Sequence, residues 1–227
     1  ESPQPAPEAE EVLPEVTPVD PLELEIGYGL IPLVDQASGG QLLRRITLLR
    51  KQIAQELGFV MPTVRIRDNL TLRPNEYRIL VRGVKAGDGE AYPDRLMVMT
   101  TTGDAPQLDG IAAREPAFGL PAVWIPEGQR AAAEAQGYAV VDAASVITTH
   151  LSEVVRRHAA ALLRRQDVQR LLDTVRREHP AVVDELVPHL LSLSEVHQVL
   201  QLLLEEQVPI RDLVTILEVL GNHARTV

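Results

Sequence analysis

Apolar and polar residues alternate in several short stretches of the first half of the chain, which is the period-two pattern of half-buried β-strands. Leu22, Leu24 and Ile26 alternate with two glutamates, and Gly87-Asp88-Gly89 between two apolar runs indicates a β-hairpin. The predicted strands are Leu22–Ile26, Thr63–Asp68, Tyr77–Lys85, Tyr92–Thr100, Ala122–Ile125 and Tyr138–Val141.

Apolar residues recur at helical spacing in two further stretches of the first half and throughout the second half. Residues Gln41–Leu57 form an amphipathic pattern, and Gly58 stands where a helix end is expected. Ser194 is a candidate N-cap, and Pro209 suits a first helical turn. The remaining predicted helices are Glu127–Ala135, the region from Ala143 to Leu162, Asp167–Glu178, Ala181–Leu186, Ser194–Glu206 and Pro209–Leu220.

This distribution of elements predicts an α+β fold in which a mixed first half is followed by an all-helical module. We expect a flexible, acidic, proline-rich linker first, then a mixed α/β subdomain interrupted by a small β-rich insertion, and then a helical subdomain. In residue numbers these are 1–20 for the linker, 21–76 and 115–150 for subdomain 1, 77–114 for subdomain 2 and 151–227 for subdomain 3.

Composition narrows the classes of function. More than half of the formal charge of −10 lies in the first 20 residues, which hold six acids and no base. The rest of the chain therefore lacks the strongly basic character of a nucleic-acid-binding domain, and 3% aromatic residues leave little for base stacking. The absence of cysteine excludes disulfides and thiolate metal ligands.

The longest apolar runs, such as Val199–Leu204, are far too short to span a bilayer, and no secretory signal is visible at the start. The chain does not begin with Met. We therefore expect a soluble fragment excised from a longer protein, with no membrane insertion of its own.

Residues with catalytic or metal-binding potential do not form a convincing pattern. His150 and His158 are eight residues apart, which is too far for joint ligation of one metal, so we expect histidines in solvent or at helix ends. Asp142, Ser145 and His150 resemble a hydrolytic triad in composition, but no G-x-S-x-G elbow surrounds the serine. We expect no enzyme activity, catalytic residue, metal or cofactor.

The segment Glu115–Pro121 carries the most informative polar and aromatic residues. Phe118 is one of only two phenylalanines, and it lies between Pro116 and Gly119 in a predicted loop. A rare aromatic in a rigid loop beside an acid suits a partner-binding anchor. The alternative is that Phe118 fills the protein's own core.

The chain resembles the cytoplasmic domain of the flagellar type III export-gate family, FHIPEP. The resemblance begins at LELEIGYGLIPLVD, Leu22–Asp35, and five blocks in the same order carry it over most of the chain. The other four blocks are Arg50–Asn69, Glu115–Leu120 followed by Trp124-Ile125, Thr148–Leu151 and Val208–Leu220.

The resemblance implies a docking platform for export chaperones and their cargo at the cytoplasmic face of the bacterial inner membrane. In the family, a membrane part precedes a cytoplasmic domain of four subdomains, and nine copies of that domain form a ring. Other export-apparatus proteins are further implied partners, and no nucleic acid is. The membrane part is absent here, and the fourth subdomain would follow Val227.

The family's chaperone-docking dimple maps onto six positions of this chain. Its acid, often Asp in relatives, corresponds to Glu115, its aromatic to Phe118 and its threonine to Thr149. We expect Phe118 and Leu120 to form its floor and Glu115 and Thr149 its polar rim. The apolar wall positions correspond to Leu120, Val141 and Val146.

Three other interpretations remain open on the sequence. The chain could belong to an injectisome export gate, which would dock different chaperones. It could be an α/β enzyme with a small-molecule site, which requires a concave pocket with convergent polar groups. It could also be a purely structural ring element without any partner-binding hollow.

Overall fold

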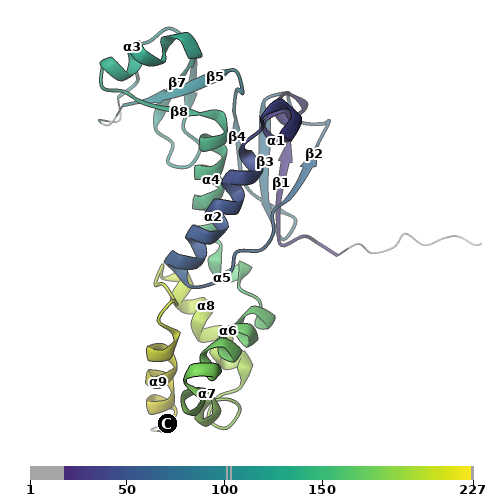
Figure 1. Ribbon diagram of the computed structural model, residues 1–227, viewed down its shortest axis with the longest axis vertical. Helices are drawn as coiled ribbons and strands as arrows, with labels where there is room; N and C mark the ends of the chain where they lie inside the picture. Colours follow the sequence, from purple (N-terminus) through teal and green to yellow (C-terminus); the bar gives the residue numbers. More distant parts are fainter. Residues whose placement is uncertain (1–17, 101, 103, 226–227) are drawn as a thin grey trace, which may run out of the picture.

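A computed structural model describes residues 18–100, 102 and 104–225, so the linker expected for residues 1–20 lies almost wholly outside the described part. Figure 1 shows an elongated molecule with two small β-sheets at one end and helices α6 to α9 at the other. Two helices, α2 (Leu42–Leu57) and α4 (Ala143–Arg157), lie side by side between these ends.

The first sheet has the strand order β2-β1-β3-β4, with β1 parallel to β2 and antiparallel to β3. The predicted alternation is confirmed in β1, where Leu22, Leu24 and Ile26 are buried. Helix α2 ends at Gly58, which takes the left-handed conformation (φ +86°) expected of a helix C-cap glycine. The elements are β1 (Leu22–Ile26), η1 (Tyr28–Leu30), α1 (Ile31–Val34), η2 (Gln36–Ser38), β2 (Arg65–Asp68), β3 (Glu76–Val81) and β4 (Val84–Glu90).

The second sheet is antiparallel throughout, with the strand order β6-β7-β5-β8. Strand β7, one of its two inner strands, buries Trp124, whose ring meets that of Tyr92 edge-on at 5.4 Å between centroids. The elements are β5 (Arg95–Met99), β6 (Ile111–Arg114), β7 (Pro121–Pro126), η3 (Glu127–Gln129), α3 (Arg130–Ala135) and β8 (Ala139–Asp142).

The strands of residues 77–114, expected as an insertion of their own, are divided between the two sheets. Strands β3 and β4 complete the first sheet through pairing with β1, whereas β5 and β6 both pair with β7 in the second. Strand pairing over long sequence separations decides this division, and alternation within one strand does not reveal its neighbour.

The hairpin predicted at Gly87-Asp88-Gly89 is wrong. The chain turns instead at Arg82-Gly83, where both residues have positive φ (50° and 77°), as a two-residue type I′ turn requires. Gly87 and Gly89 lie inside β4 because other side chains approach them closely. A Cβ on Gly87 would come within 2.7 Å of His150 Nε2, and one on Gly89 within 2.8 Å of the Tyr77 hydroxyl.

The rest of the described chain is helical. Two predicted N-termini are wrong: α8 is capped by Ser192, which forms a capping box with Glu195, and α9 by Asp212, which leaves Pro209 outside the helix. No helix among the described residues is both long enough and apolar enough to cross a membrane. The remaining helices are α5 (Ala159–Leu162), α6 (Arg165–Glu178), α7 (Pro180–Leu186), α8 (Leu193–Glu205) and α9 (Leu213–Ala224).

One continuous hydrophobic core runs through the first sheet, α2, α4 and the helical half. Two contacts tie the helical half to the first sheet and α2. The Arg82 guanidinium donates to the Ala161 carbonyl at 2.6 and 2.9 Å, and the Ile210 N–H donates to the Leu57 carbonyl at 2.8 Å. The end of α2 is therefore held against the segment that leads into α9.

We predict that Gly87→Ala destabilises the fold by about 1–3 kcal/mol, because the added methyl group overpacks the space held by the His150 ring. Gly128→Ala is the matched control, since a Cβ there meets no atom within 4 Å. Urea unfolding of both variants measures the difference. Equal stability of the two variants would contradict the role assigned to Gly87.

Candidate functional site

The six residues singled out from the sequence all line one small hollow, together with Met99 and Ser145. The hollow has a volume of about 160 Å³. Its walls come from the loop between β6 and β7, from strands β5 and β8, and from the first turns of α4. Residues separated by more than thirty positions in the chain thus meet at the seam between the second sheet and α4.

Glu115 fixes the loop that carries Phe118. Its side chain is only 4% exposed, and its two carboxylate oxygens accept the N–H groups of Ala117 (2.9 Å) and Phe118 (2.7 Å). The backbone of Glu115 also pairs with Gly119 and Leu120, each at 2.8 Å. The polar rim expected at Glu115 is therefore wrong, because this carboxylate is engaged inside the loop.

Further contacts hold the same loop from outside. Gly119 takes the left-handed conformation (φ +73°), and its carbonyl accepts a hydrogen bond from Arg114 at 2.9 Å. Arg157 of α4 donates to the Ala117 carbonyl at 3.4 Å. The loop is thus attached to α4 as well as to its own strands.

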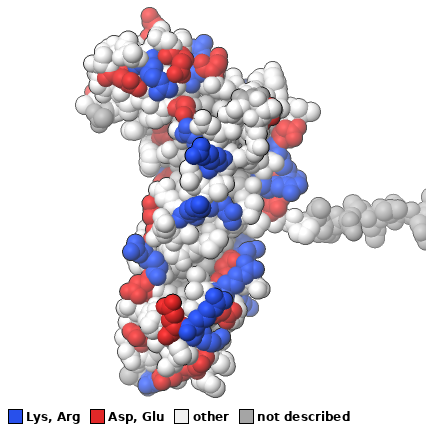
Figure 2. All heavy atoms as spheres, viewed as in Figure 1, with Lys and Arg blue, Asp and Glu red and all other residues white. Residues whose placement is uncertain are grey.

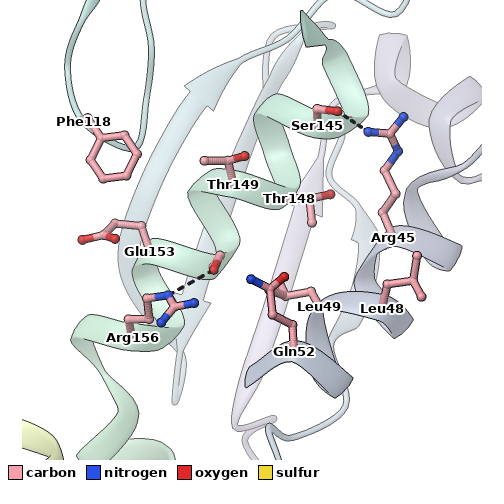
Figure 3. A pocket seen from close by; sticks show the side chains of 11 residues that line it. Arg45, Leu48, Leu49, Gln52, Phe118, Ser145, Thr148, Thr149, Glu153 and Arg156 are labelled. Atoms are coloured by element: carbon pink, nitrogen blue, oxygen red, sulfur yellow. Dashed lines mark hydrogen bonds between the residues drawn. The ribbon is translucent and has the colours of Figure 1, made fainter. Parts of the chain in front are cut away.

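Phe118 stands at the edge of the hollow and is 62% exposed, so it does not fill the protein's own core. Leu120 is 38% exposed, whereas Val146 is buried below. The floor expected from Phe118 and Leu120 is therefore wrong: both side chains form the rim. Figure 3 shows the Phe118 ring hanging from its loop toward Thr149 on α4.

A second, larger hollow adjoins the first and shares Phe118, Ser145 and Thr149 with it. It is a groove of about 430 Å³ between α2 and α4 (Figure 3). We refer to it as the α2–α4 groove. Its lining residues are Arg45, Leu48, Leu49, Gln52, Phe118, Ser145, Thr148, Thr149, Ser152, Glu153 and Arg156. No pattern in the sequence predicts this groove, since the pairing of α2 with α4 cannot be read from either helix alone.

Ion pairs between the two helices hold the groove's width. Arg45 of α2 contacts Asp142 at 2.6 Å and also donates to the Ser145 hydroxyl. Near the other end of α2, Arg156 of α4 pairs with Glu56 and also donates to Ser152. These arginines are already engaged in holding the helices together.

His150 is buried, with 6% of its surface exposed, and not a solvated or helix-end residue as expected. Its Nδ1 shares a hydrogen bond of 2.8 Å with the hydroxyl of Tyr77 on β3. Burial lowers the pKa of His150 below its ordinary value, and the nearby carboxylates of Glu115 and Asp88 partly oppose this effect. The pair joins α4 to the first sheet directly behind Thr149.

The arrangement offers no catalytic chain of hydrogen bonds. The Asp142 carboxylate accepts the Ser145 N–H at 2.8 Å as a helix N-cap, and His150 bonds to Tyr77. The Ser145 hydroxyl accepts its bond from Arg45. Within the described part of the chain, no three His, Asp or Glu side chains gather as a metal site would require.

The sequence profile of the FHIPEP family matches residues 1–227. This chain belongs to the FHIPEP family. Among curated relatives it is 50% identical over 205 residues to the flagellar biosynthesis protein FlhA of Proteus mirabilis. The match covers 90% of this chain and 30% of the relative, so the chain spans about a third of the length of that protein.

Solved structures similar to this FHIPEP-family chain include the CdsV protein of Chlamydia pneumoniae, with a TM-score of 0.79 and 26% identity. The alignment covers 97% of this chain and 64% of CdsV, which has also been solved in complex with CdsO. The nonameric EscV cytosolic domain from the type III secretion system shares the fold, with a TM-score of 0.64, 22% identity, and coverage of 91% of this chain and 59% of EscV. These matches agree with the α+β fold described above.

We predict that the free energy of unfolding decreases as the pH falls below about 6.5, because His150 accepts a proton more readily in the unfolded chain than in its buried site. Each unit by which burial lowers the pKa contributes about 1.4 kcal/mol to this loss. His150→Gln should flatten the decrease between pH 6.5 and 5, as measured by urea unfolding. The exposed His179→Gln is the matched control, and an equally flat profile in that variant would contradict the assignment.

Proposed function

We propose that this chain is part of the cytoplasmic docking platform of a flagellar type III export gate, where it binds export chaperones that carry cargo and passes the cargo toward the export channel. We place the docking contact at the hollow lined by Glu115, Phe118, Leu120, Val141, Val146 and Thr149. Membership of the FHIPEP family and identity to FlhA support the first part of this proposal. The geometry of the hollow supports the second.

The exposed Phe118 ring is the single observation that carries the docking site. An aromatic side chain that is 62% exposed leaves roughly 100 Å² of apolar surface in water, and covering it is worth about 2–3 kcal/mol. Because the Glu115 carboxylate already fixes the loop, little ordering entropy is lost when a partner binds. A rigid aromatic beside an apolar hollow is a typical anchor for one side chain of an amphipathic segment.

We further propose that the longer protein lies at the cytoplasmic face of the bacterial inner membrane and associates into a ring there. The fold similarity to the nonameric EscV domain supports the ring. The complex of CdsV with CdsO supports contact with other export-apparatus proteins.

A flagellar assignment is favoured over an injectisome one by sequence identity, which is 50% to the flagellar biosynthesis protein FlhA and 22% to EscV from the type III secretion system. The enzyme alternative is disfavoured by the hollow itself, because its one carboxylate is engaged by backbone N–H groups and, among the described residues, no second titratable side chain lines it.

We expect Phe118→Ala to weaken binding of a purified flagellar chaperone–cargo complex at least tenfold, which corresponds to about 1.4 kcal/mol. Titration calorimetry on the 227-residue chain measures this. Leu70→Ala is the matched control, because Leu70 is 82% exposed on the β2–β3 connection and should bind as the parent does.

Because Phe118 is exposed, its truncation should leave the fold intact, and circular dichroism checks this. Unchanged affinity in Phe118→Ala would move the docking contact away from the hollow. If the folded parent chain does not bind the chaperone–cargo complex at all, the proposed function itself is refuted for this chain.

A further inference from the structure

Helix α2 is strongly basic in a chain that is acidic as a whole. It contains Arg44, Arg45, Arg50 and Lys51 but only one acid, Glu56. Figure 2 shows basic side chains over the middle of the molecule, where Figure 1 places α2. This helix forms one wall of the α2–α4 groove.

The basic residues of α2 fall into two groups. Arg45 is bound to Asp142, and Arg50 donates to the Met61 carbonyl, so both are occupied within the fold. Arg44 and Lys51 are exposed, and neither forms an ion pair with an acid in the part of the chain that the structure describes. Their charges are therefore available to a partner.

Arg44 and Lys51 flank an exposed apolar side chain. Leu48 lies between them at spacings of four and three residues, which places all three on one face of α2. Leu48 is 54% exposed and lines the groove. Leu48, an apolar contact point at the groove, thus has a positive charge about one turn before it and another about one turn after it on α2.

The length of the groove sets the size of its occupant. Along α4 its lining residues run from Ser145 to Arg156, which is about 16 Å, or three turns of helix. At one end it joins the hollow through the shared residues Phe118, Ser145 and Thr149. A partner that is anchored in the hollow can therefore extend directly into the groove.

We propose that the α2–α4 groove receives one amphipathic helix of the docked chaperone, about three turns long, whose outer edge carries carboxylates that face Arg44 and Lys51. One apolar residue of this helix enters the hollow beside Phe118, and another packs on Leu48 of the opposite wall. This inference rests on the proposed function and adds the charge and length of the segment that docks. Helix-in-groove recognition, in which an amphipathic helix lays its apolar face into an apolar groove, is the mode that such a surface supports.

The test compares charge reversal at the groove with the same reversal elsewhere. Arg44→Glu combined with Lys51→Glu should weaken binding of the flagellar chaperone–cargo complex at least tenfold. Arg165→Glu combined with Arg177→Glu is the matched control, because these exposed arginines of α6 also form no ion pair among the described residues and lie away from the groove. The control should bind within twofold of the parent.

Two further measurements separate the parts of the inference. Leu48→Gln should weaken binding several-fold, whereas Leu202→Gln on α8, where the leucine is 53% exposed, should not. Raising the salt concentration should weaken binding of the parent more than that of the Arg44→Glu/Lys51→Glu variant, because exposed charges are screened.

The outcomes distinguish this inference from the function on which it rests. If Phe118→Ala weakens binding while the α2 double variant binds like the parent, the groove is not occupied by an acidic helix and the inference is overturned, although docking at the hollow stands. If the parent chain does not bind, both are overturned. Selective loss in the α2 and Leu48 variants, with intact controls, supports the inference.

Discussion

Burial of one face of α4 is the constraint on which the rest of the structure depends. This helix contacts α2, both sheets and α5, and it buries Val146, Ile147, Leu151, Val154 and Val155. At about 1.5–3 kcal/mol for each buried aliphatic side chain, this face contributes on the order of 10 kcal/mol of gross stabilisation, which is comparable to the whole net stability of a typical domain. The opposite face, together with Val146 at the edge of the buried face, lines the hollow and the groove.

The polar contacts around α4 explain why it is held in one orientation. On one side, the Tyr77–His150 pair attaches β3 to α4, and the glycine at position 87 lets β4 come close. On another side, the ion pairs of Arg45 and Arg156 attach α2. Apolar packing alone tolerates small rotations of a helix, whereas hydrogen bonds require a defined geometry. The walls of the hollow are therefore positioned by contacts that lie behind them.

Local patterns in the sequence predict much of this fold, and contacts between distant residues account for the rest. The alternation at Leu22–Ile26 and the apolar face of α2 with its terminal Gly58 each show their structure within a few residues, and the structure confirms both. Gly87 and Gly89 indicate a turn that the structure does not have at that place, because glycines that make room for a neighbouring side chain look the same in a sequence as turn glycines. Which strand pairs with which was equally invisible to local alternation.

The candidate site, too, is predicted from the sequence only in part. The resemblance to known proteins selects six residues that line one hollow, but it does not reveal that Glu115 bonds to its own loop. Nor does it reveal the groove, which exists only because α2 packs against α4 across a separation of about a hundred residues. A buried histidine and a solvated one also look the same in a sequence. The prediction of a solvated or helix-end His150 is wrong for that reason.

The loop at Phe118 has a kinetic consequence for the proposed docking. Because its backbone and its carboxylate are already bonded to one another, it has no need to fold over an arriving side chain or to unfold when that side chain leaves. Entry is then limited by diffusion and orientation, and the lifetime of the bound state by the area covered. Under the proposed function, a rigid docking site of this kind exchanges its partners rapidly, so successive partners can use the same position in turn.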